Sequence, residues 1–185
     1  MMKLYFKDFI QILETIDRES IGKLLNALEE LQRIGGRLFI IGVGGSAANA
    51  SHAVNDFRKL TNIETYAPTD NVAELTARTN DDGFDTIFEE WLKVSQLRPE
   101  DMVLIFSVGG GSATTSQNIV RALQYAKSIG SKTAGIVSRD GGFTKNADIC
   151  ILIPVVNEGL ITPFAETMQS FIWHFFVNHP LLSQE

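Results

Sequence analysis

The chain has few of the features that mark several large classes of protein. Its single cysteine, Cys150, cannot form an internal disulfide, which fits a reducing cytoplasm. Lys and Arg number 16 against 22 Asp and Glu, giving a net charge of −6. Because affinity for nucleic acid comes from clustered basic side chains, no nucleic-acid partner is expected. No apolar run reaches about 18 residues and charge begins at Lys3, so neither a membrane span nor an export signal is expected.

The composition is that of an ordinary globular chain. Of its 185 residues, 44% are hydrophobic and 21% are charged. Neither a repeat nor a long linker divides the sequence, so we predict one domain over residues 1–185. Residues 1–35 are expected to form a helical segment that packs on the domain or on a partner subunit.

Short β-like runs alternate with helical stretches along the chain. This pattern predicts an α/β fold: a single three-layer α/β/α domain whose five-stranded parallel sheet has the flavodoxin-like order 2-1-3-4-5. The expected strands are 37–43, 62–68, 102–109, 132–138 and 149–155. The expected helices are 46–60, 82–97, 116–130 and 162–178, preceded by an amphipathic helix marked by Phe6, Phe9, Ile10, Leu13 and Asp17.

Two glycine-rich loops carry hydroxyl side chains. Residues 42–49 follow the first expected strand, and residues 107–116 follow the third. In the predicted strand order these two strands are neighbours, so both loops converge beyond the carboxyl ends of the sheet. Backbone N–H groups at helix starts, together with Ser and Thr hydroxyls, favour a phosphomonoester ligand.

Other interpretations of the loops are weaker. Gly42, Gly44 and Ala47 satisfy a dinucleotide-binding fingerprint, but only Glu64 and Asp70 are candidates for its acidic partner. The lysine-containing loop of nucleotide hydrolases is absent from the sequence. Glycine and serine as simple turn formers explain one loop better than two matched ones.

Taken together, several motifs resemble the sugar isomerase (SIS) domain family, and within it the phosphoheptose isomerases. They are residues 44–48, 51–56, 70–71, 75–77, 80–85, 107–112, 138–142 and 147–148, with Glu166 and His174 on the last helix. The resemblance implies aldose–ketose isomerisation of sedoheptulose 7-phosphate to a heptose 7-phosphate, often with zinc. It also implies a homo-oligomer, in this family a homotetramer with active sites at subunit contacts.

The resemblance assigns substrate and phosphate contacts to both loops and to a residue after the second strand. These candidates are Gly44, Gly45, Ser46, Asn71, Ser107, Gly109, Gly110 and Ser112. The family commonly has Asn where Val43 stands and hydroxyl residues where Val108 and Gly109 stand. Thr114, Thr115 or Ser116 are candidates to replace the missing contacts. These departures leave the exact sugar open.

A metal and acid–base cluster is also expected. His52 and Asp56 lie four residues apart, on one face of a helix. The resemblance adds Glu166 and His174, so the predicted zinc ligands are these four residues. The family commonly has Glu at position 56 and Gln at position 166. Eight helical residues, about 12 Å of rise, separate Glu166 from His174, which makes Glu166 the least favourable ligand.

Proton transfer between two sugar carbons requires one base and one acid. The resemblance assigns the base to Asp56 and the acid to His174, roles that alternate with metal binding or follow it in separate states. A non-catalytic phosphosugar sensor of the same fold is the alternative from another functional class. Retention of all four cluster residues disfavours this alternative, while an isomerase of another phosphosugar stays open.

Overall fold

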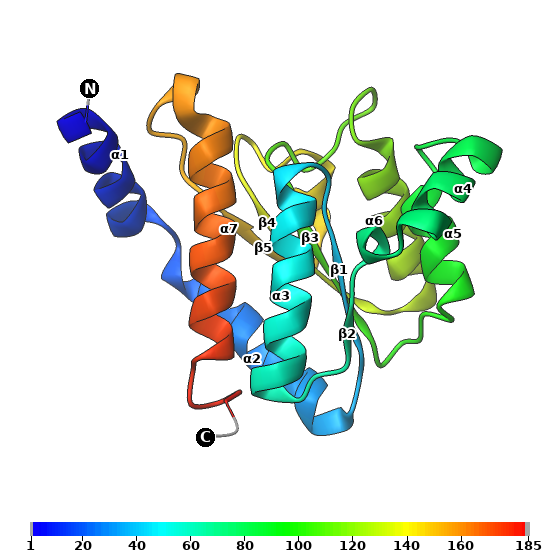
Figure 1. The fold of residues 1–185 in the computed structure, drawn as a ribbon. Coiled ribbons are helices and arrows are strands. Elements are labelled where there is room, and N and C mark those ends of the chain that lie inside the picture. The colour runs from blue at the N-terminus through cyan, green and yellow to red at the C-terminus, as the bar shows by residue number, and fades with distance from the viewer. Residues whose placement is uncertain (1, 184–185) are drawn as a thin grey trace.

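The computed structural model describes residues 2–183 and contains one five-stranded parallel sheet, in the order β2-β1-β3-β4-β5 (Figure 1). The strands are β1 Leu38–Ile41, β2 Thr65–Tyr66, β3 Met102–Phe106, β4 Lys132–Val137 and β5 Ile149–Leu152. The predicted fold class and strand order are therefore confirmed. Each strand ends earlier than predicted, and the predicted ends lie in the loops that follow.

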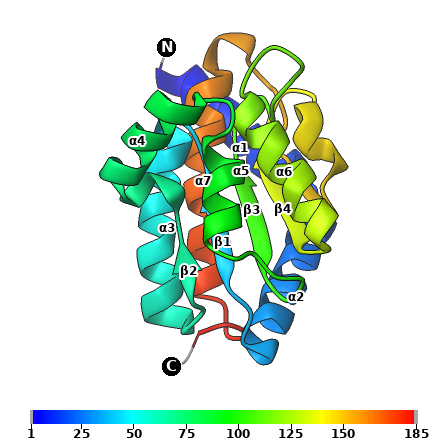
Figure 2. The same cartoon turned by 90° about the vertical axis from the view of Figure 1, so that its right-hand side faces the viewer.

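Helices cover both faces of the sheet (Figures 1 and 2). They are α1 Met2–Thr15, α2 Arg18–Ile34, α3 Gly45–Thr61, α4 Val72–Asp82, α5 Ile87–Val94, α6 Gln117–Ile129 and α7 Ile161–Val177. Leu38 and Ile40 point into the core beneath α2, α3 and α7, whereas Phe39 and Ile41 point into the core beneath α5 and α6. Successive side chains of the buried strand β1 point to opposite faces of the sheet, so this strand contributes to both apolar cores.

The N-terminal segment forms two helices rather than one continuous element. Asp17 is the N-cap of α2, where its side chain accepts a hydrogen bond from the Glu19 backbone, so its predicted place in the first helix is wrong. Phe9 and Leu13 of α1 pack against the core, but Phe6 and Ile10 are exposed. Helix α1 lies outside α7, at the edge of the molecule (Figure 1).

One predicted helix differs from the structure. The helix expected over 82–97 is limited to α5, and a separate helix, α4, precedes it. No residue of α4 is buried, so its sequence has no apolar stripe by which periodicity could reveal it. No helix within residues 2–183 is long and apolar enough to cross a lipid bilayer.

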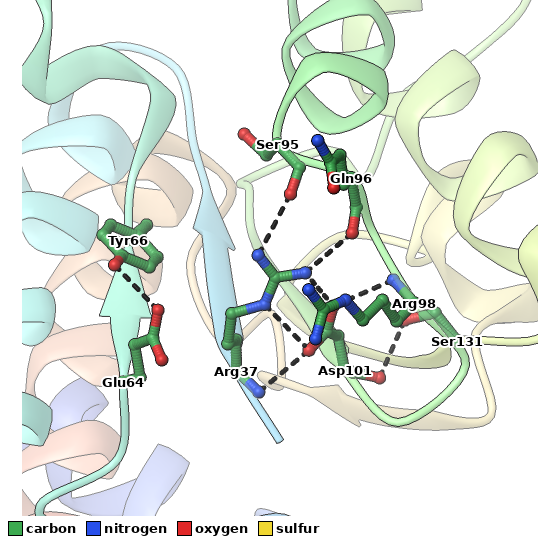
Figure 3. A network of polar contacts seen from close by, with 8 residues as sticks. All are labelled: Arg37, Glu64, Tyr66, Ser95, Gln96, Arg98, Asp101 and Ser131. Carbon is green, nitrogen blue, oxygen red and sulfur yellow. Dashed lines mark hydrogen bonds and ion pairs between the residues drawn. The ribbon is translucent and has the colours of Figure 1, made fainter. Parts of the chain in front are cut away.

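A buried ion pair joins β1 and β3 at their amino ends (Figure 3). The Asp101 carboxylate accepts hydrogen bonds from the guanidinium of Arg37, the nearest at 2.6 Å, and from the backbone N–H groups of Arg37 and Arg98. Asp101 is 2% exposed. Its hydrogen bonds raise the pKa of the Arg37 guanidinium above the ordinary value. Asp101 therefore ties the start of the sheet together.

We expect Asp101→Asn to lower the free energy of unfolding by about 2–4 kcal/mol, because Arg37 loses its buried counter-charge. Urea unfolding measures this difference. The matched control is Glu30→Gln, which removes an exposed partner of Arg33 and should cost less than about 1 kcal/mol. Equal losses in the two variants would contradict the structural role of Asp101.

Candidate active site

A cavity of about 600 Å³ lies beyond the carboxyl ends of β1, β3 and β4. We call it the loop cavity. Four of the predicted substrate contacts line it: Ser46, Ser107, Gly109 and Ser112. Both glycine-rich loops therefore meet at one hollow, as the strand order requires. Val43 and Val108 add apolar side chains to its wall.

The hydroxyls of Ser107 and Ser112 accept hydrogen bonds from the backbone of their own loop. Ser107 Oγ accepts from the Gly110 N–H at 3.0 Å, and Ser112 Oγ accepts from the Thr115 N–H at 3.1 Å. Because a hydroxyl can accept and donate at once, each O–H hydrogen remains available for a ligand. Thr115 and Ser116 also line the cavity, whereas Thr114 does not. The second loop thus presents donors suited to an anion.

The remaining candidate contacts lie outside the lining of the loop cavity. Gly110 packs against the backbone of the next loop, where a Cβ would lie 2.0 Å from the Gly141 carbonyl oxygen. Gly44 is the N-cap of α3, and Asn71 is the N-cap of α4, with its side chain accepting from the Glu74 N–H at 3.2 Å. The substrate roles of Gly44, Gly45, Gly110 and Asn71 stay predictions.

His52, Asp56 and His174 come together between α3 and α7, and we call this group the His/Asp cluster. Asp56 Oδ2 lies 3.8 Å from His52 Nε2 and 3.9 Å from His174 Nε2. One potential ligand atom of each residue lies within 4.8 Å of the other two. Tetrahedral zinc ligands are about 3.4 Å apart at usual bond lengths, so small side-chain movements would let this set hold a divalent metal.

Neighbouring groups orient the cluster. His174 Nδ1 lies 2.8 Å from the Ser170 carbonyl oxygen, to which it donates a hydrogen bond, and Nε2 faces Asp56. Asp56 Oδ1 accepts a hydrogen bond from the Asn55 side chain at 2.8 Å, leaving Oδ2 for the imidazoles. Trp173, fully buried, stacks on the His174 ring at 3.5 Å between centroids.

Glu166 is placed apart from the His/Asp cluster. Its carboxylate faces the start of α3, where a Cβ on Gly45 would lie 2.5 Å from the carboxylate carbon. Gly45 does not have a positive φ, so a Cβ there would cause no backbone strain but would displace the end of the Glu166 side chain. The free N–H groups of a helix start favour a negative charge, and Glu166 supplies one to α3.

Polar residues continue along one face of α7. Thr162 lines the loop cavity, while Glu166, Ser170 and His174 line an open groove beside it, which we call the α7 groove. Successive members are four residues apart, so they lie on the same side of the helix. The face therefore leads from the loop cavity to the His/Asp cluster.

Comparisons with known proteins agree with this architecture. The SIS domain family matches residues 4–138. A phosphoheptose isomerase from Syntrophotalea carbinolica is 30% identical over 195 residues, covering 100% of this chain and 93% of that protein. A second, from Geobacter sulfurreducens, is 33% identical over 177 residues, covering 91% of this chain and 87% of that protein. The chain belongs to the SIS domain family and, within it, to the phosphoheptose isomerases.

Solved structures support the fold. A phosphoheptose isomerase from Francisella tularensis superimposes with a TM-score of 0.85 at 23% identity, covering 100% of this chain and 97% of that chain. One from Neisseria gonorrhoeae gives a TM-score of 0.83 at 21% identity, with 96% of each chain covered. At these identities the likeness concerns the architecture.

Sequence reasoning gave several residues of this region no role. Asn49 donates from its side chain to the Glu166 carbonyl oxygen at 2.9 Å and to the Gln169 side chain at 3.1 Å, pinning α3 to α7. Arg139 lines the loop cavity from the end of β4. Asn49 and Trp173 have only local helical patterns around them, which carry no signal for contacts between helices.

We expect the His/Asp cluster to bind Co²⁺, which can be followed by the visible absorption of the bound ion. His174→Gln should abolish the absorption of bound Co²⁺, because the His/Asp cluster loses one of its three metal ligands. Glu166→Gln should retain this absorption. Loss of Co²⁺ in Glu166→Gln, equal to that in His174→Gln, would restore Glu166 to the ligand set.

Proposed function

We propose that this protein isomerises sedoheptulose 7-phosphate to a heptose 7-phosphate. The observation that carries the proposal is the joint presence of a donor-lined loop cavity beyond the carboxyl ends of the strands and a His/Asp cluster between α3 and α7. A phosphate and a carbonyl are the two ends of such a substrate. Membership of the phosphoheptose isomerases supports this choice among phosphosugars.

The two glycine-rich loops would hold different parts of the substrate. Glu166 already places a carboxylate at the start of α3, so a phosphate dianion there would be repelled. The start of α6 has no acidic residue in its first turn and lies beside the free hydroxyls of Ser107 and Ser112. The phosphate therefore belongs at the second loop, and the first loop, with Gly44, Gly45 and Ser46, faces the sugar.

Asp56 and His174 are the acid–base pair of the proposal. The Asp56 carboxylate removes a proton from C1 of the ketose, and the electron pair passes to the C2 oxygen to form an enediolate. The proton returns at C2, while the imidazole of His174 moves a proton between the two oxygens. The hydrogen bond from Asn55 holds Asp56 with Oδ2 toward the imidazoles. The carboxylate is therefore already oriented and needs little movement to transfer a proton.

Zinc is the proposed metal, held by His52, Asp56 and His174, because two imidazoles and a carboxylate match its preferred donors. When bound, zinc would polarise the substrate carbonyl. A histidine nitrogen that holds a metal has no proton to give, so the metal and acid roles of His174 belong to different states. The proposed compartment is the cytoplasm, where the lone thiol of Cys150 would stay reduced.

The test is proton NMR of sedoheptulose 7-phosphate in D₂O with the purified protein, as prepared, with added zinc and after chelation. We expect deuterium to enter at C1 and an aldose phosphate to appear. Binding of the sugar without exchange under all three conditions would instead indicate a phosphosugar sensor. A panel of shorter phosphosugars separates a wrong sugar from a wrong reaction.

We expect Asp56→Asn to lower kcat by at least about 1000-fold while the dissociation constant for sedoheptulose 7-phosphate changes little, because the change removes the base and keeps the shape. Turnover assays and calorimetry measure the two quantities. Glu100→Gln makes the same charge change at the opposite end of the sheet and should leave both unchanged. Equal loss of binding and turnover in Asp56→Asn would argue against its role as base.

We propose a homo-oligomer, with a tetramer favoured, built through α1 and α7. Met2, Phe6 and Ile10 form an exposed apolar stripe at four-residue spacing on α1. Phe171 and Phe175 of α7 are also exposed and line the α7 groove together with Glu166 and His174. A second subunit covering these aromatic residues would close the groove over the site.

Light scattering in solution should therefore give a mass several times that of one 20.4 kDa chain. Ile10→Glu and Phe171→Glu should reduce the mass and the isomerase activity together, because charge in an apolar contact opposes association. Val94→Glu places the same charge on an exposed position of α5, on the other face of the sheet, and should change neither. A monomeric wild-type protein would refute the proposed assembly.

A further inference from the structure

We propose that Arg139 is a phosphate-binding residue of the loop cavity, and that it supplies the contacts for which Val108 and Gly109 have no side-chain donor. This inference rests on the proposed function and identifies how the same site recognises its anionic end. Arg139 is the only lysine or arginine that lines this cavity in the part of the chain that the structure describes.

The backbone at Arg139 adopts an unusual conformation. Its φ is 55°, in the left-handed region, which a residue with a Cβ rarely adopts. The turn is held on both sides: the Gly141 N–H donates to the Ser138 carbonyl oxygen at 3.0 Å, and Ser138 Oγ donates to the Ile153 carbonyl oxygen at 3.0 Å. Strain of this kind is retained when the direction of a side chain matters.

The strained turn places the side chain of Arg139 beside the second glycine-rich loop. Of all the heavy atoms around Gly109, Arg139 Cδ is the one that a Cβ there would meet, at 3.8 Å. The stem of Arg139 thus lies along the backbone of residue 109. Arg139 lines the same cavity as the hydroxyls of Ser107 and Ser112.

The turn and the glycine-rich loop are joined as one unit. The Phe143 N–H donates to the Gly111 carbonyl oxygen at 2.8 Å, and the Thr144 N–H donates to the Gly110 carbonyl oxygen at 3.0 Å. A Cβ on Gly142 would lie 2.2 Å from the Gly109 carbonyl oxygen, so the two backbones are in contact. The backbone at Arg139 is therefore held in place relative to the second glycine-rich loop.

The guanidinium of Arg139 is available for a ligand. Among residues 2–183 its side chain has no hydrogen-bond or ion-pair partner. The neighbouring carboxylate, Asp140, also lines the cavity and accepts a hydrogen bond from the Gly142 N–H at 3.1 Å. A planar guanidinium donates two parallel hydrogen bonds to a phosphate, which two neutral hydroxyls would otherwise have to supply.

The experiment measures binding of inorganic phosphate by calorimetry, and steady-state kinetics with sedoheptulose 7-phosphate, for the wild-type protein and three variants. Arg139→Gln should weaken phosphate binding roughly 10- to 100-fold and raise KM with little change in kcat, because the contact exists in both ground and transition states. Arg139→Lys should recover part of the affinity, since it keeps the charge but not the fork of donors. Lys145→Gln is the control: it removes an exposed positive charge close by that does not line the cavity, and should change nothing.

Phosphate binding that is absent in the wild type, unchanged in Arg139→Gln, or equally weakened in Lys145→Gln would overturn the inference. A wild-type protein that binds phosphate through Arg139 but converts no phosphosugar would refute the proposed reaction and leave this anion contact standing. Turnover of sedoheptulose 7-phosphate with an unchanged KM in Arg139→Gln would support the proposed reaction and refute the role of Arg139 in phosphate binding. Thermal unfolding without ligand should be equal in all four proteins, because Arg139 is exposed.

Discussion

The packing of α7 against α3 is the contact on which the rest of the candidate site depends. Two helices of 17 residues lie side by side, pinned by the side chain of Asn49 and closed by the buried ring of Trp173. This contact brings His174 to His52 and Asp56. The same alignment sets Glu166 against Gly45. A slip of one helical turn, about 5.4 Å, would undo both arrangements at once.

Much of the fold could be predicted because the sheet is buried on both faces. Buried parallel strands appear in the sequence as short apolar runs, and the helices between them as apolar stripes, so the order of elements was accessible from the sequence. Helix α4 was not, because none of its residues is buried and its first turn depends on the Asn71 cap. Strand β2 was predicted over 62–68 and is confirmed there, but it pairs only through Thr65 and Tyr66.

The candidate site was accessible from the sequence where its residues lie close together in the chain, and where the strand order brings the two glycine-rich loops together. The pair His52 and Asp56 followed from four-residue spacing within one helix, and the helical rise already counted against Glu166 as a fourth ligand. The approach of His174 to that pair came from family resemblance, since it depends on how two helices align. Arg139 was given no role because its direction is set by a left-handed turn and by backbone contacts between two loops, neither of which has a residue pattern.

The two helix starts facing this edge of the sheet differ in charge, and this difference gives the site a direction. Helix α3 begins against the carboxylate of Glu166, whereas α6 begins with no acidic residue in its first turn, beside hydroxyls and one arginine. A phosphate dianion is therefore repelled from the first and attracted to the second. Thr162 lines the loop cavity and His174 belongs to the His/Asp cluster, so one face of α7 connects the two parts of the proposed site. In the proposed reaction, the His/Asp cluster is the end of the site at which protons are transferred.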